Sequence, residues 1–147
     1  MNRYHTPSQR GVAFTAVLAL LFSLASCKEA NNRELAEQGV TQFHSQLNSE
    51  QYLAICAGAE EKFRKAANEI EFVALLQAVH RKLGKVQQSK LQSSQVGWFA
   101  GEGTVVTLFY NTQFVDGKAG EKFIWHVRDN HAILDGYYIN SSVLITK

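Results

Sequence analysis

Cysteine and proline are scarce in this chain of 147 residues, which has two cysteines and one proline. Two cysteines provide neither a disulfide framework nor a cysteine-based metal site. The proline is Pro7, so no proline interrupts a helix or a central strand in the rest of the chain. Arg3 and Arg10 account for the excess of 15 basic over 13 acidic residues. The remaining chain is formally neutral and has no run of four like charges, which argues against a nucleic-acid partner.

Acidic residues are absent from the N-terminal region. Residues 1–10 carry two arginines, and residues 11–26 carry no charge. That uncharged run is shorter than the roughly 20 residues that cross a bilayer, and its basic start is typical of a secretory signal. It ends in Leu24-Ala25-Ser26-Cys27, which resembles the lipobox of bacterial lipoprotein precursors. An uncleaved anchor and a signal cleaved elsewhere are the alternatives.

The lipobox resemblance implies cleavage between Ser26 and Cys27 and a lipid on Cys27. Residues 1–26 would then be the signal peptide, residues 27–33 a lipidated tether and residues 34–147 one α+β domain. In many Gram-negative bacteria, an aspartate after the lipidated cysteine retains such a protein in the inner membrane. Lys28 stands at that position here. We therefore expect the periplasmic face of the outer membrane.

Helical periodicity follows the tether. Ala36, Val40, Phe43 and Leu47 recur at the spacing of one helix face. Ser49 can cap a second helix that carries Tyr52, Leu53 and Cys56, and residues 59–66 are a short helical piece. A longer helix is indicated by Asn68 as its N-cap and Gly84 at its end. Its apolar residues are Phe72, Leu75, Leu76, Val79 and Leu83. The apolar stretch around Cys56 is typical of a buried thiol.

After Gly84 the spacing of the apolar residues changes to every second residue, which is typical of strands. Apolar residues alternate from Val106 through Leu108 to Phe114, and again from Phe123 to Val127. Asp116-Gly117 and Asp129-Asn130 are hairpin turns, so consecutive strands should be antiparallel neighbours. The predicted fold is α+β, with N-terminal helices packed on a curved four-stranded antiparallel meander.

These patterns together resemble small bacterial envelope proteins with a cystatin-like or nuclear-transport-factor-like fold. The resemblance covers about residues 33–143. It rests on segments of the helical half and of the strands: Glu61–Arg64, Glu71–Leu76, Lys82-Leu83-Gly84, Val105–Tyr110, Lys122–Val127 and Leu134–Ile139. Such proteins often have Gly-x-Trp after the last turn, where residues 129–133 stand here. The resemblance implies a curved sheet on a helical layer, sometimes with a pocket, and supplies no catalytic residues.

Two groups of residues could in principle bind a metal or carry out catalysis, but each is explained by a structural role. His126, His131 and Asp129 flank one turn and could ligate zinc, but alternation points His126 outward. Four acids lie at predicted helix starts, where the helix dipole favours them: Glu60, Glu61, Glu69 and Glu71. We therefore predict no metal, no cofactor and no enzymatic activity.

Two groups of sheet residues are candidate binding sites. Tyr110, Trp125 and Tyr137 lie on apolar stripes and, with Asp135 nearby, could line a pocket inside the sheet. An ordinary aromatic core is the alternative. On the opposite faces, Phe109 and Ile124 would form an apolar interface, unless the helices cover that side instead.

The expected function is therefore a lipid-anchored binding or interaction module with an envelope protein as partner. The alternative is a small-molecule carrier or an enzyme that uses the pocket.

Overall fold

The computed structural model describes the backbone of residues 12–145 and the side chains from Lys28 to Ile145. The side chains of the lipobox, including Cys27, lie outside the described residues. The chain divides into two compact units, Met1–Asn31 and Asn32–Lys147. The first consists of helix wherever it is described, and the second contains the α+β domain.

The first helix, α1, spans Val12–Asn48 and so belongs to both units. The residues 28–33, predicted to be a tether, are helical. Each of them advances the chain by about 1.5 Å, instead of the 3.3–3.6 Å of an extended tether. In the described part of the chain, no helix combines the length and apolar character needed to cross a bilayer.

Four shorter helices lie in the second unit: α2 (Tyr52–Ala57), α3 (Glu61–Ala67), α4 (Glu69–Leu83) and α5 (Ser142–Ile145). Both predicted ends of α4 are confirmed. The Asn68 side chain accepts a hydrogen bond from the Ile70 backbone N–H. Gly84 follows the helix with φ of +74°, a conformation that glycine adopts without strain.

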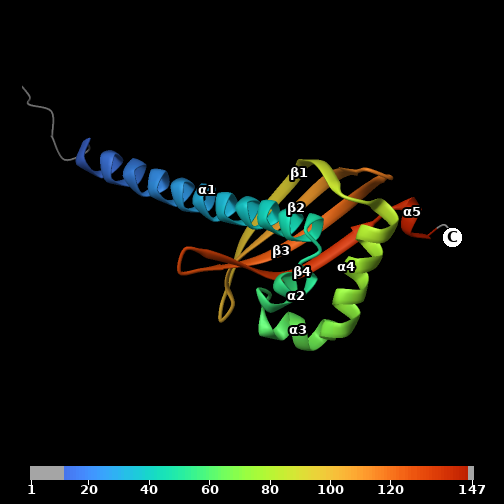
Figure 1. Cartoon of the computed structure of the whole chain (residues 1–147). Helices are drawn as coiled ribbons and strands as arrows, with labels where there is room; N and C mark the ends of the chain where they lie inside the picture. Colours follow the sequence, from blue (N-terminus) through green and yellow to red (C-terminus); the bar gives the residue numbers. More distant parts are fainter. Residues whose placement is uncertain (1–11, 146–147) are drawn as a thin grey trace, which may run out of the picture. The chain divides into compact units, whose positions relative to one another are not determined.

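The sheet follows the helices in the chain. Its strands are β1 (Val86–Phe99), β2 (Gly103–Phe114), β3 (Lys118–Arg128) and β4 (His131–Asn140). They form one antiparallel meander in the order β1-β2-β3-β4 (Figure 1). Asp129 and Asn130 both have positive φ, as the tight β3–β4 turn requires. The predicted α+β class and four-stranded meander are confirmed.

The core lies between the helices and one face of this sheet, which we call the helix face. The predicted helix stripe is buried, with Ala36 and Leu47 of α1 fully inaccessible to solvent. The predicted strand stripe is buried as well, as Leu108 and Phe123 show. The other side, which carries Phe109, Ile124 and Tyr138, is the outer face. Helices therefore cover the side that alternation indicates.

We expect Leu76→Ala to lower the free energy of unfolding by about 2–5 kcal/mol, because Leu76 is fully buried and its truncation leaves a cavity. Denaturant melting of a soluble chain that begins at Lys28 measures this loss. Leu75→Ala is the matched control, since Leu75 is 37% exposed. It should cost less than about 1 kcal/mol. Equal losses for the two variants would mean that the buried side of α4 is wrongly assigned.

Candidate functional site

A buried carboxylate joins α1 to the middle of the sheet. Glu121 on β3 has a side chain with no exposure to solvent. Its Oε2 lies 2.9 Å from Nε2 of His44 on α1 and accepts a hydrogen bond from the Thr112 hydroxyl on β2. Its Oε1 accepts a hydrogen bond from the Tyr137 hydroxyl on β4, at 2.7 Å. Burying a charge is costly unless it is hydrogen-bonded, and here side chains from three other elements contact one carboxylate.

Glu121 is not among the residues that the sequence singled out, although a signal for it exists. The alternation that predicts this strand runs from Phe123 to Val127, whereas β3 begins at Lys118. If the alternation is extended from Phe123 by two residues toward the N-terminus, Glu121 falls on the helix face. His44 likewise follows a correctly predicted core position, Phe43. The sequence does not reveal that His44 and Glu121 are partners, because 77 residues separate them.

The predicted pocket residues Tyr110, Trp125 and Tyr137 share the helix face and are all buried. Tyr137 belongs to an aromatic cluster in which its ring centroid lies 4.7 Å from that of Phe43 and 5.1 Å from that of Phe123. Burial and the Glu121 charge raise the pKa of Tyr137 well above its usual value. Burial, with the charges of Glu37 and Glu121, raises the pKa of Tyr110 to about 12. Both hydroxyls therefore stay protonated at physiological pH.

Trp125 lines a small hollow between α1, α2 and the sheet. The hollow has a volume of about 100 Å³ and is also lined by Phe43, Ile55 and Leu134. Gly39 leaves room for the indole, because a Cβ on Gly39 would stand 2.8 Å from the ring. The Trp125 Nε1–H is buried without a hydrogen-bond partner among the described residues.

Asp135 is separate from these aromatic residues. It lies at an irregularity in the β3–β4 pairing, and its Oδ2 is 3.6 Å from Nε2 of His126. Nδ1 of His126 lies 3.4 Å from Oε1 of Glu60, which also pairs with Arg128. The prediction that His126 points outward into solvent is therefore wrong: it is 7% exposed. Glu60 reaches it because the α2–α3 connection pairs with β4 at Ala59 and Leu134.

Phe109 and Ile124 lie on the outer face, as alternation predicts. Phe109 pairs with Lys122 and Thr107 pairs with Ile124, so the two apolar residues are diagonal neighbours. Both are half-buried rather than fully exposed. Ile124 packs over Gly136, where a Cβ would lie 3.2 Å from its Cδ1.

A shallow hollow lies beside these residues on the outer face. It measures about 340 Å³ and stands over Gly120, where an added Cβ would meet no atom within 4 Å. Tyr138, 59% exposed, lies beside Lys122, whose Nζ is 5.0 Å from its ring centroid. A polar hollow of about 640 Å³ adjoins it and shares Asn111, Gly120 and Asn140.

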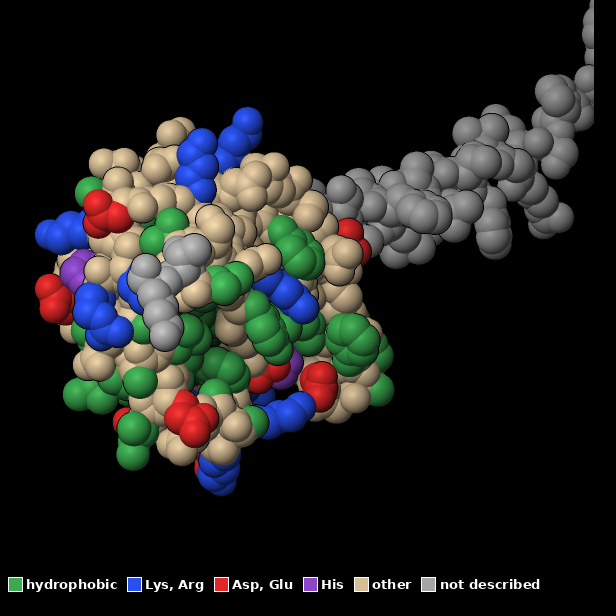
Figure 2. Space-filling model, turned by 90° about the vertical axis from the view of Figure 1, so that its right-hand side faces the viewer, with side chains coloured by type: hydrophobic (Ala, Val, Ile, Leu, Met, Phe, Trp, Pro, Cys, Tyr) green, Lys and Arg blue, Asp and Glu red, His purple; other side chains and the backbone are tan. Residues whose placement is uncertain are grey.

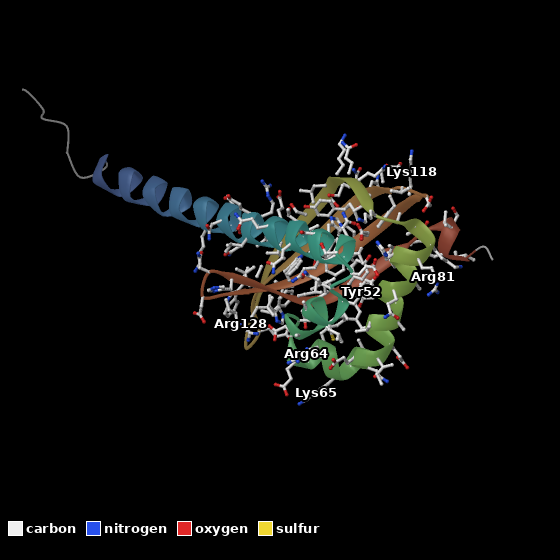
Figure 3. All side chains as sticks on the ribbon, viewed as in Figure 1. Tyr52, Arg64, Lys65, Arg81, Lys118 and Arg128 are labelled. Atoms are coloured by element: carbon white, nitrogen blue, oxygen red, sulfur yellow. The ribbon has the colours of Figure 1, made fainter. Side chains whose placement is uncertain are left out.

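Charge is mixed on the face of the molecule that Figure 2 shows. Figure 2 shows basic and acidic side chains interspersed, with hydrophobic groups between them. Figure 3 shows Lys118 and Arg128 at opposite ends of the sheet, and Arg64 and Lys65 together on α3. The described residues hold no group of three or more histidine, cysteine or acidic side chains placed to bind a metal ion.

Comparison with known proteins gives no further assignment. No protein-family model matches the chain, and no curated protein matches it by sequence. The resemblance to cystatin-like and nuclear-transport-factor-like envelope proteins stays a prediction.

Removal of the Tyr137 hydroxyl should change how stability depends on pH. The folded pKa lies above the unfolded value near 10, so this hydroxyl stabilises the fold fully below pH 10. That contribution is lost as the pH rises toward the folded pKa, by at most about 1.4 kcal/mol per pH unit. Denaturation of Tyr137→Phe between pH 7 and pH 11 should show a smaller alkaline loss than the unmodified protein. An unchanged profile for Tyr137→Phe would contradict the assignment.

Proposed function

We propose that this protein is a bacterial envelope lipoprotein, anchored through Cys27, whose α+β domain binds an envelope protein through the outer face of the sheet. The observation that carries this proposal is the contrast between the two faces. The helix face is filled by side chains, and both oxygens of its buried carboxylate have hydrogen-bond partners. The outer face keeps an open hollow beside half-buried and exposed aromatic rings.

The lining of the hollow indicates the chemistry of its partner. Phe109 and Tyr138 offer apolar surface, and aromatic residues often dominate binding at interfaces. Lys122 and Lys118 supply positive charge in the two adjoining hollows. Glu121 is their one acidic lining residue, and its carboxylate is buried. A partner that presents an apolar side chain next to carboxylates or carbonyl oxygens fits this surface.

The alternative function, a carrier or an enzyme that uses an apolar pocket inside the curved sheet, would need space on the helix face. Pockets for drug-sized ligands typically measure about 300–1,000 Å³. The hollow beside Trp125 measures about 100 Å³. Its volume therefore favours the interaction module over a carrier.

Mass spectrometry of the mature N-terminus tests the anchor. We expect an acylated Cys27 as the first residue, because acyl chains hold a protein at a membrane through the burial of many methylene groups. The protein should fractionate with the outer membrane, since Lys28 follows the cysteine. An intact Met1 or an unmodified N-terminus elsewhere would refute the anchor. Recovery in the inner membrane would refute the location alone.

Crosslinking in cells tests the outer face. Tyr138→Ser should lower the yield of the crosslinked partner about tenfold or more, because truncating an aromatic hot spot costs about 2 kcal/mol or more. Leu53→Ser is the matched control, since Leu53 is 66% exposed on α2. It should leave the yield unchanged.

Ile124→Asp extends this test to the predicted interface and should also abolish capture. Because Ile124 packs against Gly136, circular dichroism must show that the Ile124→Asp variant folds. Folded Tyr138→Ser and Ile124→Asp variants that retain full capture would refute the outer face as the binding surface.

A further inference from the structure

The tip of the β1–β2 hairpin carries two exposed aromatic side chains. Trp98 is 72% exposed and Phe99 is 54% exposed. Trp98 continues the helix-face stripe of Val96, beyond the part of the sheet that the helices cover. The Phe99 ring lies on the other face, where its nearest atom is 3.1 Å from the position of a Cβ on Gly97. The tip is thus apolar on both faces.

The packing of α1 shows which end of the sheet this is. His44 lies over Glu121 and Gly39 lies over Trp125, so α1 runs antiparallel to β3. Seven residues of helix separate Gly39 from Asn32, a rise of about 10 Å. Three strand residues from Trp125 to Arg128 span about the same length. The Asn32 end of the domain therefore lies at the end of the sheet that carries the β3–β4 turn.

The β1–β2 tip lies at that same end. Thr104 pairs with both Trp98 and Val127, so Trp98 is level with the last residues of β3. Figure 1 shows the β1–β2 and β3–β4 turns together at one end of the sheet, opposite the β2–β3 turn. Cys27 is five residues before Asn32, which keeps it within about 18 Å of Asn32 in any conformation.

We propose that Trp98 and Phe99 insert into the lipid surface beside the anchor and orient the domain on the membrane. This inference rests on the proposed acylation of Cys27. Tryptophan favours the interface between headgroups and acyl chains, and phenylalanine favours the apolar side of it. Two basic side chains at this end of the sheet have acidic partners: Lys62 pairs with Glu102, and Arg128 pairs with Glu60. Pairing lowers the cost of bringing these charges close to a lipid surface.

Tryptophan fluorescence of the lipidated protein tests the proposal. The chain has two tryptophans, so the difference between the unmodified protein and Trp98→Phe isolates the Trp98 signal. The protein is reconstituted into vesicles of phosphatidylethanolamine and phosphatidylglycerol with brominated acyl chains. Brominated chains should quench the Trp98 component by about half or more, and aqueous iodide should quench it little.

The opposite end of the sheet provides the matched control. Val115, in the β2–β3 turn, is 54% exposed, the same fraction as Phe99. In a Trp98→Phe, Val115→Trp variant, iodide should quench the new tryptophan and brominated chains should not. Equal quenching of both positions by brominated chains would overturn the proposed orientation.

Mass spectrometry of the same sample separates the two proposals. An acylated Cys27 with a Trp98 signal quenched only by iodide overturns the membrane contact and leaves the anchor intact. An unmodified Cys27 overturns the anchor, and the membrane contact falls with it.

Discussion

The Glu121 carboxylate is the constraint on which the rest of the domain depends. A charge without solvent exposure destabilises a fold unless its hydrogen-bonding capacity is filled. Here the partners come from α1, β2 and β4, while Glu121 itself lies on β3. One side chain therefore sets where α1 lies along the sheet. That placement brings Gly39 over Trp125 and closes the helix face with aromatic side chains.

Because helices cover only one face of the sheet, the two faces have different roles. The helix face supplies stability, since its aromatic and aliphatic groups are buried. The outer face keeps the hollow over Gly120, which is where we propose that a partner binds. The meander puts the β1–β2 and β3–β4 turns at one end and the β2–β3 turn at the other. Anchoring, orientation and recognition would then use three separate parts of the protein.

Local patterns predicted the fold well but predicted the surroundings of polar residues poorly. The α1 and α4 stripes and the β2 stripe follow from periodicity, because one side of each element must be buried. The exception is Leu75, which was predicted to lie on the α4 stripe and is 37% exposed. The same alternation placed Phe109 and Ile124 on the outer face. Alternation did not predict the burial of His126, which lies between Glu60, far away in the sequence, and Asp135 on the neighbouring strand. It also did not single out Glu121, whose partner His44 is 77 residues away. Half-burial of Ile124 likewise depends on Gly136 of the neighbouring strand.

The sequence alone determined the antiparallel meander and most of the aliphatic residues of the core, because periodicity and turn chemistry act over a few neighbouring residues. It also carries the lipobox, which is a local pattern. Only the tertiary structure decided that Tyr110, Trp125 and Tyr137 are core residues around a small hollow, that Glu121 is the buried carboxylate, and that Trp98 lies at the Asn32 end of the domain. Each of these depends on contacts between residues far apart in the chain, and no local pattern records such contacts.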